Sequence, residues 1–117
     1  MNIDLFRKKM WGLREAFDRD ARASKESNLA WEWLINFYSN LDPEERKLGD
    51  QILMEWALSD DENVRCDALV VIGHFNILSA TQTLQELATR LKDSKAPGAV
   101  YELQKVNSIL RDMNAGR

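Results

Sequence analysis

The sequence predicts an all-α protein of about six helices, and three observations carry that prediction. Apolar residues recur at spacings of three and four along most of the chain, which is the period of one helix face. Only five of the 117 residues are glycine and two are proline, so few positions interrupt a helix. Segments rich in β-branched residues are also few. A chain of this length can bury one core but not two independent ones, so residues 1–117 are expected to form a single helical domain.

The stretch from Asp60 to Leu91 shows this pattern most clearly, as two helices joined by a tight corner. Asp60 or Asp61 can cap the first helix, because a short carboxylate accepts hydrogen bonds from the free N–H groups of a first turn. Ser79, with Gln82 three residues later, has the pattern of a capping box that opens the second helix. The link is short, so the two helices are expected to lie antiparallel. Their apolar faces are Val64, Ala68, Val71, Ile72 and Phe75, then Leu84, Leu87, Ala88 and Leu91.

Helices are also predicted in the rest of the chain, with one especially clear boundary. Asp42 supplies a cap, Pro43 suits the first helical position and Glu45 completes a capping box. The further predicted helices are residues 4–19, 28–40, 43–58 and 97–113. The apolar stripe of the last one is Val100, Leu103, Val106, Leu110 and Met113.

The predicted helix at residues 28–40 is apolar most of the way round. A helix of this kind is either buried between layers or meets a partner. In the first case Trp31 and Tyr38 belong to the core. In the second they are exposed, where large aromatic side chains are natural anchors of a protein interface. The sequence leaves both alternatives open.

The order of the helices suggests two stacked antiparallel pairs. Residues 28–40 with 43–58, and residues 61–75 with 79–91, are expected to pair, while the first and last helices cap the ends. One segment resembles the first helix of a HEAT repeat, which has an acid, a Val-Arg pair, small residues and an aliphatic run ending near glycine. That segment is Asp61-Glu62-Asn63-Val64-Arg65-Cys66-Asp67-Ala68-Leu69-Val70-Val71-Ile72-Gly73. This resemblance implies a fold and no chemistry.

Acidic residues are concentrated in the middle of the chain. Residues 1–25 carry seven basic and four acidic groups, a balance of +3, whereas residues 26–67 carry three basic and eleven acidic groups, a balance of −8. Such a region repels phosphate backbones, which disfavours nucleic acid as the direct partner, and it speeds encounter with a basic protein. A well-solvated helical surface with capping acids would show the same pattern.

No catalytic, metal or cofactor pattern is found in the sequence. His74 is the only histidine and Cys66 the only cysteine, which excludes a disulfide within the chain and a cysteine-based zinc site, and neither residue has a recognisable catalytic setting. The triplet Asp60–Glu62 has the setting of a helix start and lacks the spacing of a calcium loop. We therefore expect no enzyme, no metal and no cofactor.

The expected location is the cytoplasm, because neither a membrane span nor a secretory signal is found. The longest apolar run, residues 68–72, is far too short to cross a membrane. The first residues contain charges and lack the unbroken apolar core of a secretory signal.

As a whole, the chain resembles the small HEAT-like immunity proteins of bacterial polymorphic-toxin and contact-dependent inhibition systems. The shared features are size, acidic balance, a tryptophan-rich second helix and the segment Leu58-Ser59-Asp60-Asp61-Glu62, followed by Val64-Arg65 and Asp67-Ala68-Leu69. Such proteins are cytosolic and neutralise a toxin domain, frequently a nuclease. The resemblance implies a cognate toxin protein as the partner.

The leading hypothesis is therefore an immunity protein that binds and occludes a basic toxin domain. The alternative is a generic HEAT-like adaptor, or a homodimer that associates through residues 28–40; neither hypothesis involves nucleic acid or a membrane. An enzyme of the helical-repeat DNA glycosylase kind would need a basic channel, and the acidic middle argues against it. The predicted partner-binding residues are Trp31, Glu32, Tyr38, Glu44, Glu55, Asp60, Asp61 and Asp67.

Overall fold

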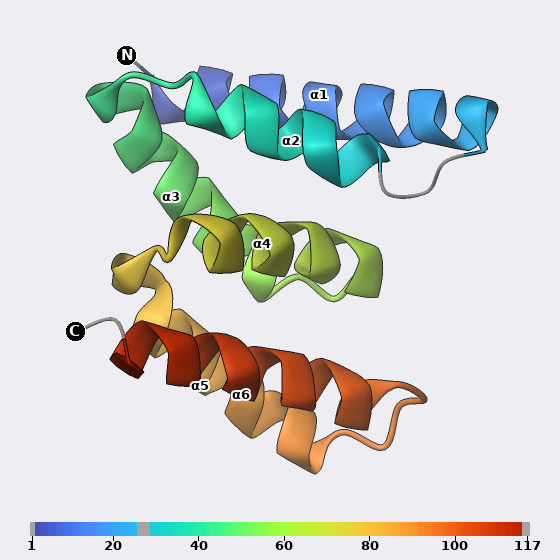
Figure 1. Ribbon diagram of the computed structural model, residues 1–117, viewed down its shortest axis with the longest axis vertical. Coiled ribbons are helices and arrows are strands. Elements are labelled where there is room, and N and C mark those ends of the chain that lie inside the picture. The colour runs from blue at the N-terminus through green and yellow to red at the C-terminus, as the bar shows by residue number, and fades with distance from the viewer. Residues whose placement is uncertain (1, 26–28, 116–117) are drawn as a thin grey trace. The chain divides into compact units, whose positions relative to one another are not determined.

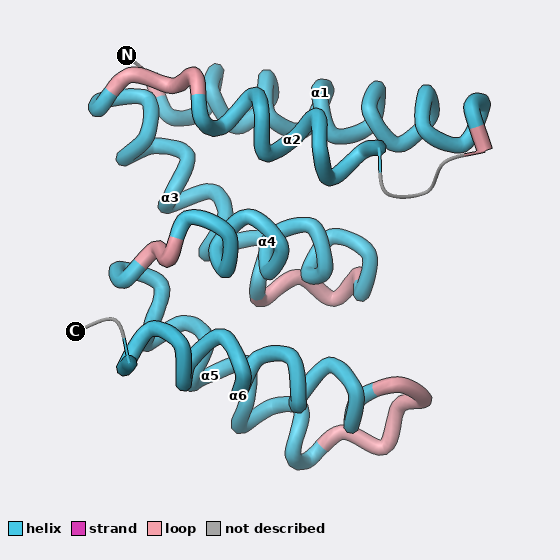
Figure 2. Tube along the Cα trace, viewed as in Figure 1, coloured by secondary structure: helices cyan, strands magenta, loops and turns pink. Residues whose placement is uncertain are grey.

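The structure is a computed structural model that describes residues 2–25 and 29–115, and it has no strand among them (Figure 1; Figure 2). The predicted all-α class with six helices is confirmed. None of the described helices has both the length and the apolar content needed to cross a bilayer. The helices are α1 (Ile3–Ser24), α2 (Leu29–Ser39), α3 (Pro43–Ala57), α4 (Glu62–Phe75), α5 (Thr81–Asp93) and α6 (Ala99–Ala115), and a 3₁₀ turn, η1 (Leu78–Ala80), precedes α5.

The chain divides into two compact units, residues 1–53 and residues 54–117. The first unit contains α1, α2 and most of α3, and the second contains the last turn of α3 together with α4, α5 and α6. The prediction that residues 1–117 form a single domain stays a prediction.

In the first unit, α1 and α2 form an antiparallel pair. The ring centroids of Phe17 and Trp33 lie 5.8 Å apart, and Nζ of Lys9 lies 5.9 Å from the ring centroid of Phe37. As the residue number rises along α2, the number of the contacting residue in α1 falls, so the two helices run antiparallel. The buried apolar side chains of these two helices are Phe6, Met10, Ala21, Leu34 and Tyr38.

In the second unit, α5 and α6 are the closest helix pair and lie side by side (Figure 1). Thr81, at the start of α5, lies 3.6 Å from the sulfur of Met113, near the end of α6, so the two helices run antiparallel. Their facing residues are mainly aliphatic, and burying them is the main source of stability for such a pair. The buried side chains of α5 are Leu84, Leu87, Ala88 and Leu91.

Helix α4 runs parallel to α6 within the same unit. Near the starts of the two helices Arg65 pairs with Glu102. Further along, a Cβ at Gly73 would lie 3.4 Å from Cγ1 of Ile109. The two contacts join residues that are 37 and 36 positions apart, and this nearly constant separation shows that the two helices run in the same direction. The residues that α4 buries are Val64, Ala68, Leu69, Val71 and Ile72.

The predicted grouping of the helices is not confirmed. The closest pairs are α1 with α2 and α5 with α6, whereas the sequence suggested pairs at 28–40 with 43–58 and at 61–75 with 79–91. Short links motivated that prediction. The first and last helices each pack most closely against one neighbour, α1 against α2 and α6 against α5, and their role as end caps stays a prediction.

Three of the helix ends are set by local hydrogen bonds of the expected kind. The capping box before α3 is confirmed, since the backbone N–H of Glu45 donates to Oδ1 of Asp42 at 2.8 Å and the N–H of Asp42 donates to Oε1 of Glu45 at 3.1 Å. Asp61 caps α4. At the other end of α4, Asn76 adopts the left-handed conformation, with φ of 51°, which Asn tolerates better than most residues.

The capping box predicted at Ser79 is wrong. Ser79 lies inside η1, and α5 begins two residues later, without a side-chain cap. Thr81 instead donates its hydroxyl hydrogen to the carbonyl oxygen of Leu78 at 2.7 Å. A serine three residues before glutamine has the right spacing for a box, but here the serine is occupied by the turn that precedes the helix.

Helix α1 extends well beyond the predicted residue 19. Arg22 pairs with Asp18 at 3.1 Å, one turn apart, and Ala21 is buried. Lys25 then ends the helix in the left-handed conformation. An intrahelical ion pair and one small buried residue support the helix in a segment whose composition suggested a loop.

The predicted stripe of α6 is right at Val106 and Met113, which are buried, and wrong at its start. Leu103 and Leu110 are half-buried. Val100 is 67% exposed, whereas Ala99, Glu102, Val106 and Met113 are buried. The spacing of the true stripe is also helical, but it includes a glutamate. A carboxylate at a core position needs a partner, which is supplied by α4.

Candidate protein-binding site

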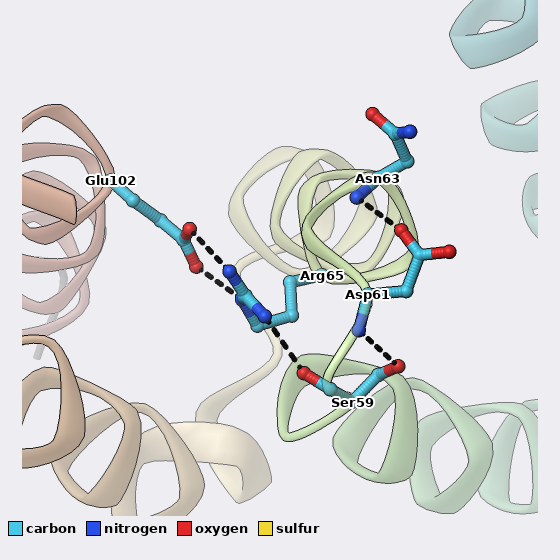
Figure 3. A network of polar contacts seen from close by, with 5 residues as sticks. All are labelled: Ser59, Asp61, Asn63, Arg65 and Glu102. Carbon is cyan, nitrogen blue, oxygen red and sulfur yellow. Dashed lines mark hydrogen bonds and ion pairs between the residues drawn. The ribbon is translucent and has the colours of Figure 1, made fainter. Parts of the chain in front are cut away.

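The turn that leads into α4 holds the acidic residues Asp60 and Asp61 in different roles, and Figure 3 shows those of Asp61. The backbone N–H of Asp61 donates to Oγ of Ser59 at 3.1 Å, and Oδ1 of Asp61 accepts from the N–H of Asn63 at 2.8 Å. Asp61 is therefore the cap. Asp60 is exposed, and in the part of the chain that the structure describes its carboxylate makes no hydrogen bond or ion pair.

Arg65 ties the same turn to α6 (Figure 3). Its Nε and Nη2 donate to the two carboxylate oxygens of Glu102 at 2.7 and 3.0 Å, and its Nη1 donates to the carbonyl oxygen of Ser59 at 2.9 Å. The hydrogen bond to Glu102 raises the pKa of Arg65 above its usual value. The side chains of Arg65 and Glu102 are only 17% and 5% exposed, so this bidentate ion pair is largely shielded from water.

A pocket of about 180 Å³ opens beside this turn. Its apolar lining comes from Leu58, directly after α3, and from two leucines of α5. Its polar lining comes from the turn before α4, from Arg65 and from the carboxyl end of α5. The lining residues are Leu58, Ser59, Asp60, Arg65, Leu87, Arg90, Leu91 and Ser94. It combines an apolar floor with a charged rim, as pockets that receive an anchor side chain do.

Tyr38 is not a surface anchor, so its inclusion among the partner-binding residues was wrong. Its side chain is 0% exposed. Its hydroxyl donates to the carboxylate of Asp50, and the Arg46 guanidinium lies 4.6 Å from the centroid of its ring. Arg46 also donates to the carbonyl oxygen of Tyr38 at 3.0 Å. This residue is a core aromatic whose polar end is satisfied by its own unit.

The contribution of Asp50 to stability is expected to fall as the pH rises. Burial raises the pKa of Asp50 above its ordinary value of 3.8, so the folded chain holds that proton more tightly than the unfolded chain. The contribution is present in full below the unfolded pKa and is lost as the pH rises through the folded pKa. Urea unfolding of the full chain across this acidic interval measures it, and Asp50→Asn should lack the component. The same pH dependence in both proteins would contradict the assignment.

The other predicted contact residues are mostly at the surface. Trp31 is 36% exposed on α2. Of the predicted carboxylates, Asp67 is half-buried, whereas the remaining five are exposed: Glu32, Glu44, Glu55, Asp60 and Asp61. Glu44 lies with Lys47, Leu48 and Gln51 around a depression of about 390 Å³ on α3. Their role as partner contacts stays a prediction, and they are divided between the two units.

Tyr101 was missed by the sequence analysis, although it is 77% exposed at the start of α6. It lies at a second pocket of about 210 Å³, whose lining also includes Glu62, Cys66 and Lys105. The signal was present, because a tyrosine next to the exposed Val100 falls outside the stripe that α6 buries. Tyr101 also lies outside the stripe predicted from the sequence, so its exposure could have been inferred there.

His74, Cys66 and the acidic residues are the described side chains that could carry chemistry. Among the described residues no group of three or more His, Cys, Asp or Glu side chains could hold a metal ion. His74 is exposed, with its ring edge-on to Phe75 at 4.8 Å between centroids. Cys66 is half-buried, and burial raises the pKa of its thiol, which lowers the fraction of reactive thiolate.

What the described surface offers is therefore a set of exposed carboxylates with pockets beside them, which suits recognition of another molecule. Comparison of the chain with protein-family models, with curated proteins and with solved structures gives no match.

Proposed function

We propose that this chain is a binding protein that neutralises a basic toxin domain by covering it, as its resemblance to HEAT-like immunity proteins implies. One observation carries the proposal: five of the six carboxylates predicted to contact the partner are exposed. Glu32, Glu44 and Asp60 also make no hydrogen bond or ion pair with any described residue. No described residue therefore neutralises these three charges, which can act on a partner.

The mechanism is steric and electrostatic. Exposed carboxylates attract lysine and arginine side chains, which a nuclease needs in order to hold phosphate groups. Carboxylates at the rim of the contact accelerate encounter, whereas carboxylates that lose their water in the contact slow dissociation. Bound in this way, the chain would block access to the toxin's substrate without performing any reaction.

The test uses the domain encoded by the reading frame immediately upstream, purified in a catalytically inactive form. We expect it to form a stoichiometric complex with the full chain, measured by titration calorimetry at low and high salt. Reversing Glu44 and Glu55 to lysine should weaken binding by about tenfold or more, as expected when a charged partner at the contact is lost. Circular dichroism checks that the variant remains helical.

The matched control reverses two exposed carboxylates outside residues 26–67, Asp20→Lys with Asp112→Lys, which makes the same change in net charge. This control should lose much less affinity. If no complex forms with the unaltered chain, or if both double variants lose the same affinity, the proposal is overturned. In the second case net charge alone, and not a defined surface, would account for the attraction.

A further inference from the structure

We propose that the pocket beside the turn into α4 receives a lysine or arginine side chain of the protein partner, with its stem on the leucine floor and its cation at Asp60. This inference rests on the proposed function and deepens it, because it names the chemistry that the partner must present at one place. All residues of the pocket lie within the second unit.

The charges around the pocket leave one carboxylate without a partner. Arg65 is paired with Glu102, and Nη2 of Arg90 lies 3.0 Å from Oε1 of Glu86. Both arginines that line the pocket are thus neutralised by carboxylates. Asp60 has no such partner in the described ranges, residues 2–25 and 29–115. The local balance at the rim is therefore one negative charge, which selects a cation.

The floor of the pocket selects the kind of cation. Leu58, Leu87 and Leu91 line it, and such a surface favours contact with methylene groups. Lysine and arginine bury an aliphatic stem while their charged end stays at a polar rim. A neutral aliphatic side chain would fill the floor but would leave the Asp60 carboxylate desolvated without compensation. An acidic side chain would be repelled by it.

The pocket at Tyr101 is less suited to the same occupant. Glu62 lies there, but Lys105 lines the same pocket, so a carboxylate and an ammonium group offset each other. The amino-terminal end of α6 also contributes positive potential near Tyr101, whereas the carboxyl end of α5, which lines the Asp60 pocket at Leu91 and Ser94, contributes negative potential there. The pocket at Asp60 therefore has the stronger charge complementarity to a basic partner.

The first test needs no partner protein. The probe is the n-butylammonium ion, which reproduces the end of a lysine side chain, and n-butanol is the neutral probe of similar shape. Titration of the ¹⁵N-labelled full chain should give saturable shifts in the amide signals of Leu87, Leu91 and Ser94 with butylammonium, and weaker shifts with butanol. Asp60→Asn should weaken the butylammonium response by about tenfold, whereas Asp112→Asn, an exposed carboxylate elsewhere in this unit, should leave it unchanged.

Asp60→Asn is expected to fold, because Asp61 and not Asp60 caps α4. Equal shifts with the two probes, or an unchanged butylammonium response in Asp60→Asn, would overturn the inference.

The second test uses the toxin domain of the preceding section and separates the two proposals. The inference is supported if Asp60→Asn weakens the affinity for the toxin domain about tenfold while Asp112→Asn leaves that affinity unchanged. If the complex forms and Asp60→Asn binds as tightly as the unaltered chain, this inference fails and the proposed function stands. If no complex forms while butylammonium still binds at Asp60, the proposed function fails and, with it, the assignment of the occupant to a toxin.

Discussion

Replacing Glu102 with leucine should lower the free energy of unfolding by about 3 kcal/mol. The two carboxylate oxygens of Glu102 accept from Nε and Nη2 of Arg65, and the Glu102 side chain is 5% exposed. Leucine fills similar volume but leaves the guanidinium nearly buried without its counter-charge. The cost comes mainly from that unpaired cation, because only one of its three contacts, to the carbonyl oxygen of Ser59, remains.

Urea unfolding of the full chain measures this effect. Two further variants test whether the loss comes from the buried charge left without a partner. Glu86→Leu removes the partner of Arg90 from an exposed pair, with side chains 54% and 55% exposed, and should change stability by less than about 1 kcal/mol. Arg65→Met with Glu102→Leu removes both buried charges and should recover most of the loss. A Glu102→Leu protein as stable as the unaltered chain would show that the pair contributes nothing.

Replacing Tyr38 with alanine should destabilise the chain by about 3–5 kcal/mol. The ring is fully buried, and the nearest atom to a Cβ built at Gly49 is Cε2 of this ring, only 2.8 Å away. Truncation therefore opens a cavity against α3 and leaves the half-buried Asp50 carboxylate without its hydroxyl donor. The loss would be one of folding and not of partner recognition.

The comparison with Trp31 separates a core aromatic from a surface one. Trp31→Ala removes a larger side chain, but one that is 36% exposed, so less than half the loss seen for Tyr38→Ala is expected. Thermal and urea unfolding of the two variants measure the difference. Tyr38→Phe should fall between them, because it keeps the ring and removes only the hydroxyl, with its hydrogen bonds to Asp50 and to the carbonyl oxygen of Arg46. Equal losses for Tyr38→Ala and Trp31→Ala would contradict the assignment of Tyr38 to the core.

The parts of the fold that depend on local chemistry were predictable from the sequence. Asp42 and Glu45 cap α3 through hydrogen bonds between residues three apart, and a pattern of this range is visible in the sequence. The choice between Asp60 and Asp61 as the cap of α4 was not predictable, since both precede the helix and only the backbone conformation distinguishes them. That choice is what leaves Asp60 available at the pocket.

The parts that depend on distant partners were not predictable. Val100 and Leu103 fit the helical period of a buried face on α6 as well as Ala99 and Glu102 do. Only the ion pair of Glu102 with Arg65, 37 positions earlier, explains why the glutamate is buried. Tyr38 and Trp31 lie on a helix that is apolar most of the way round, so periodicity could not say which of them faces inward. The pocket at Asp60 is lined by the turn between α3 and α4, by Arg65 of α4 and by residues of α5 and its carboxyl end, and no single segment of the sequence contains it.

The Arg65–Glu102 pair also limits how α4 and α6 can slide past each other. Leucine, valine and isoleucine rows tolerate a shift of one helical turn, about 5.4 Å, because one aliphatic contact replaces another. A guanidinium that grips both oxygens of one carboxylate does not tolerate it, since the same shift would leave two dehydrated charges facing hydrocarbon. The pair thus selects one alignment of the two helices out of several that hydrophobic packing alone would accept, and the geometry of the neighbouring Asp60 pocket depends on that alignment.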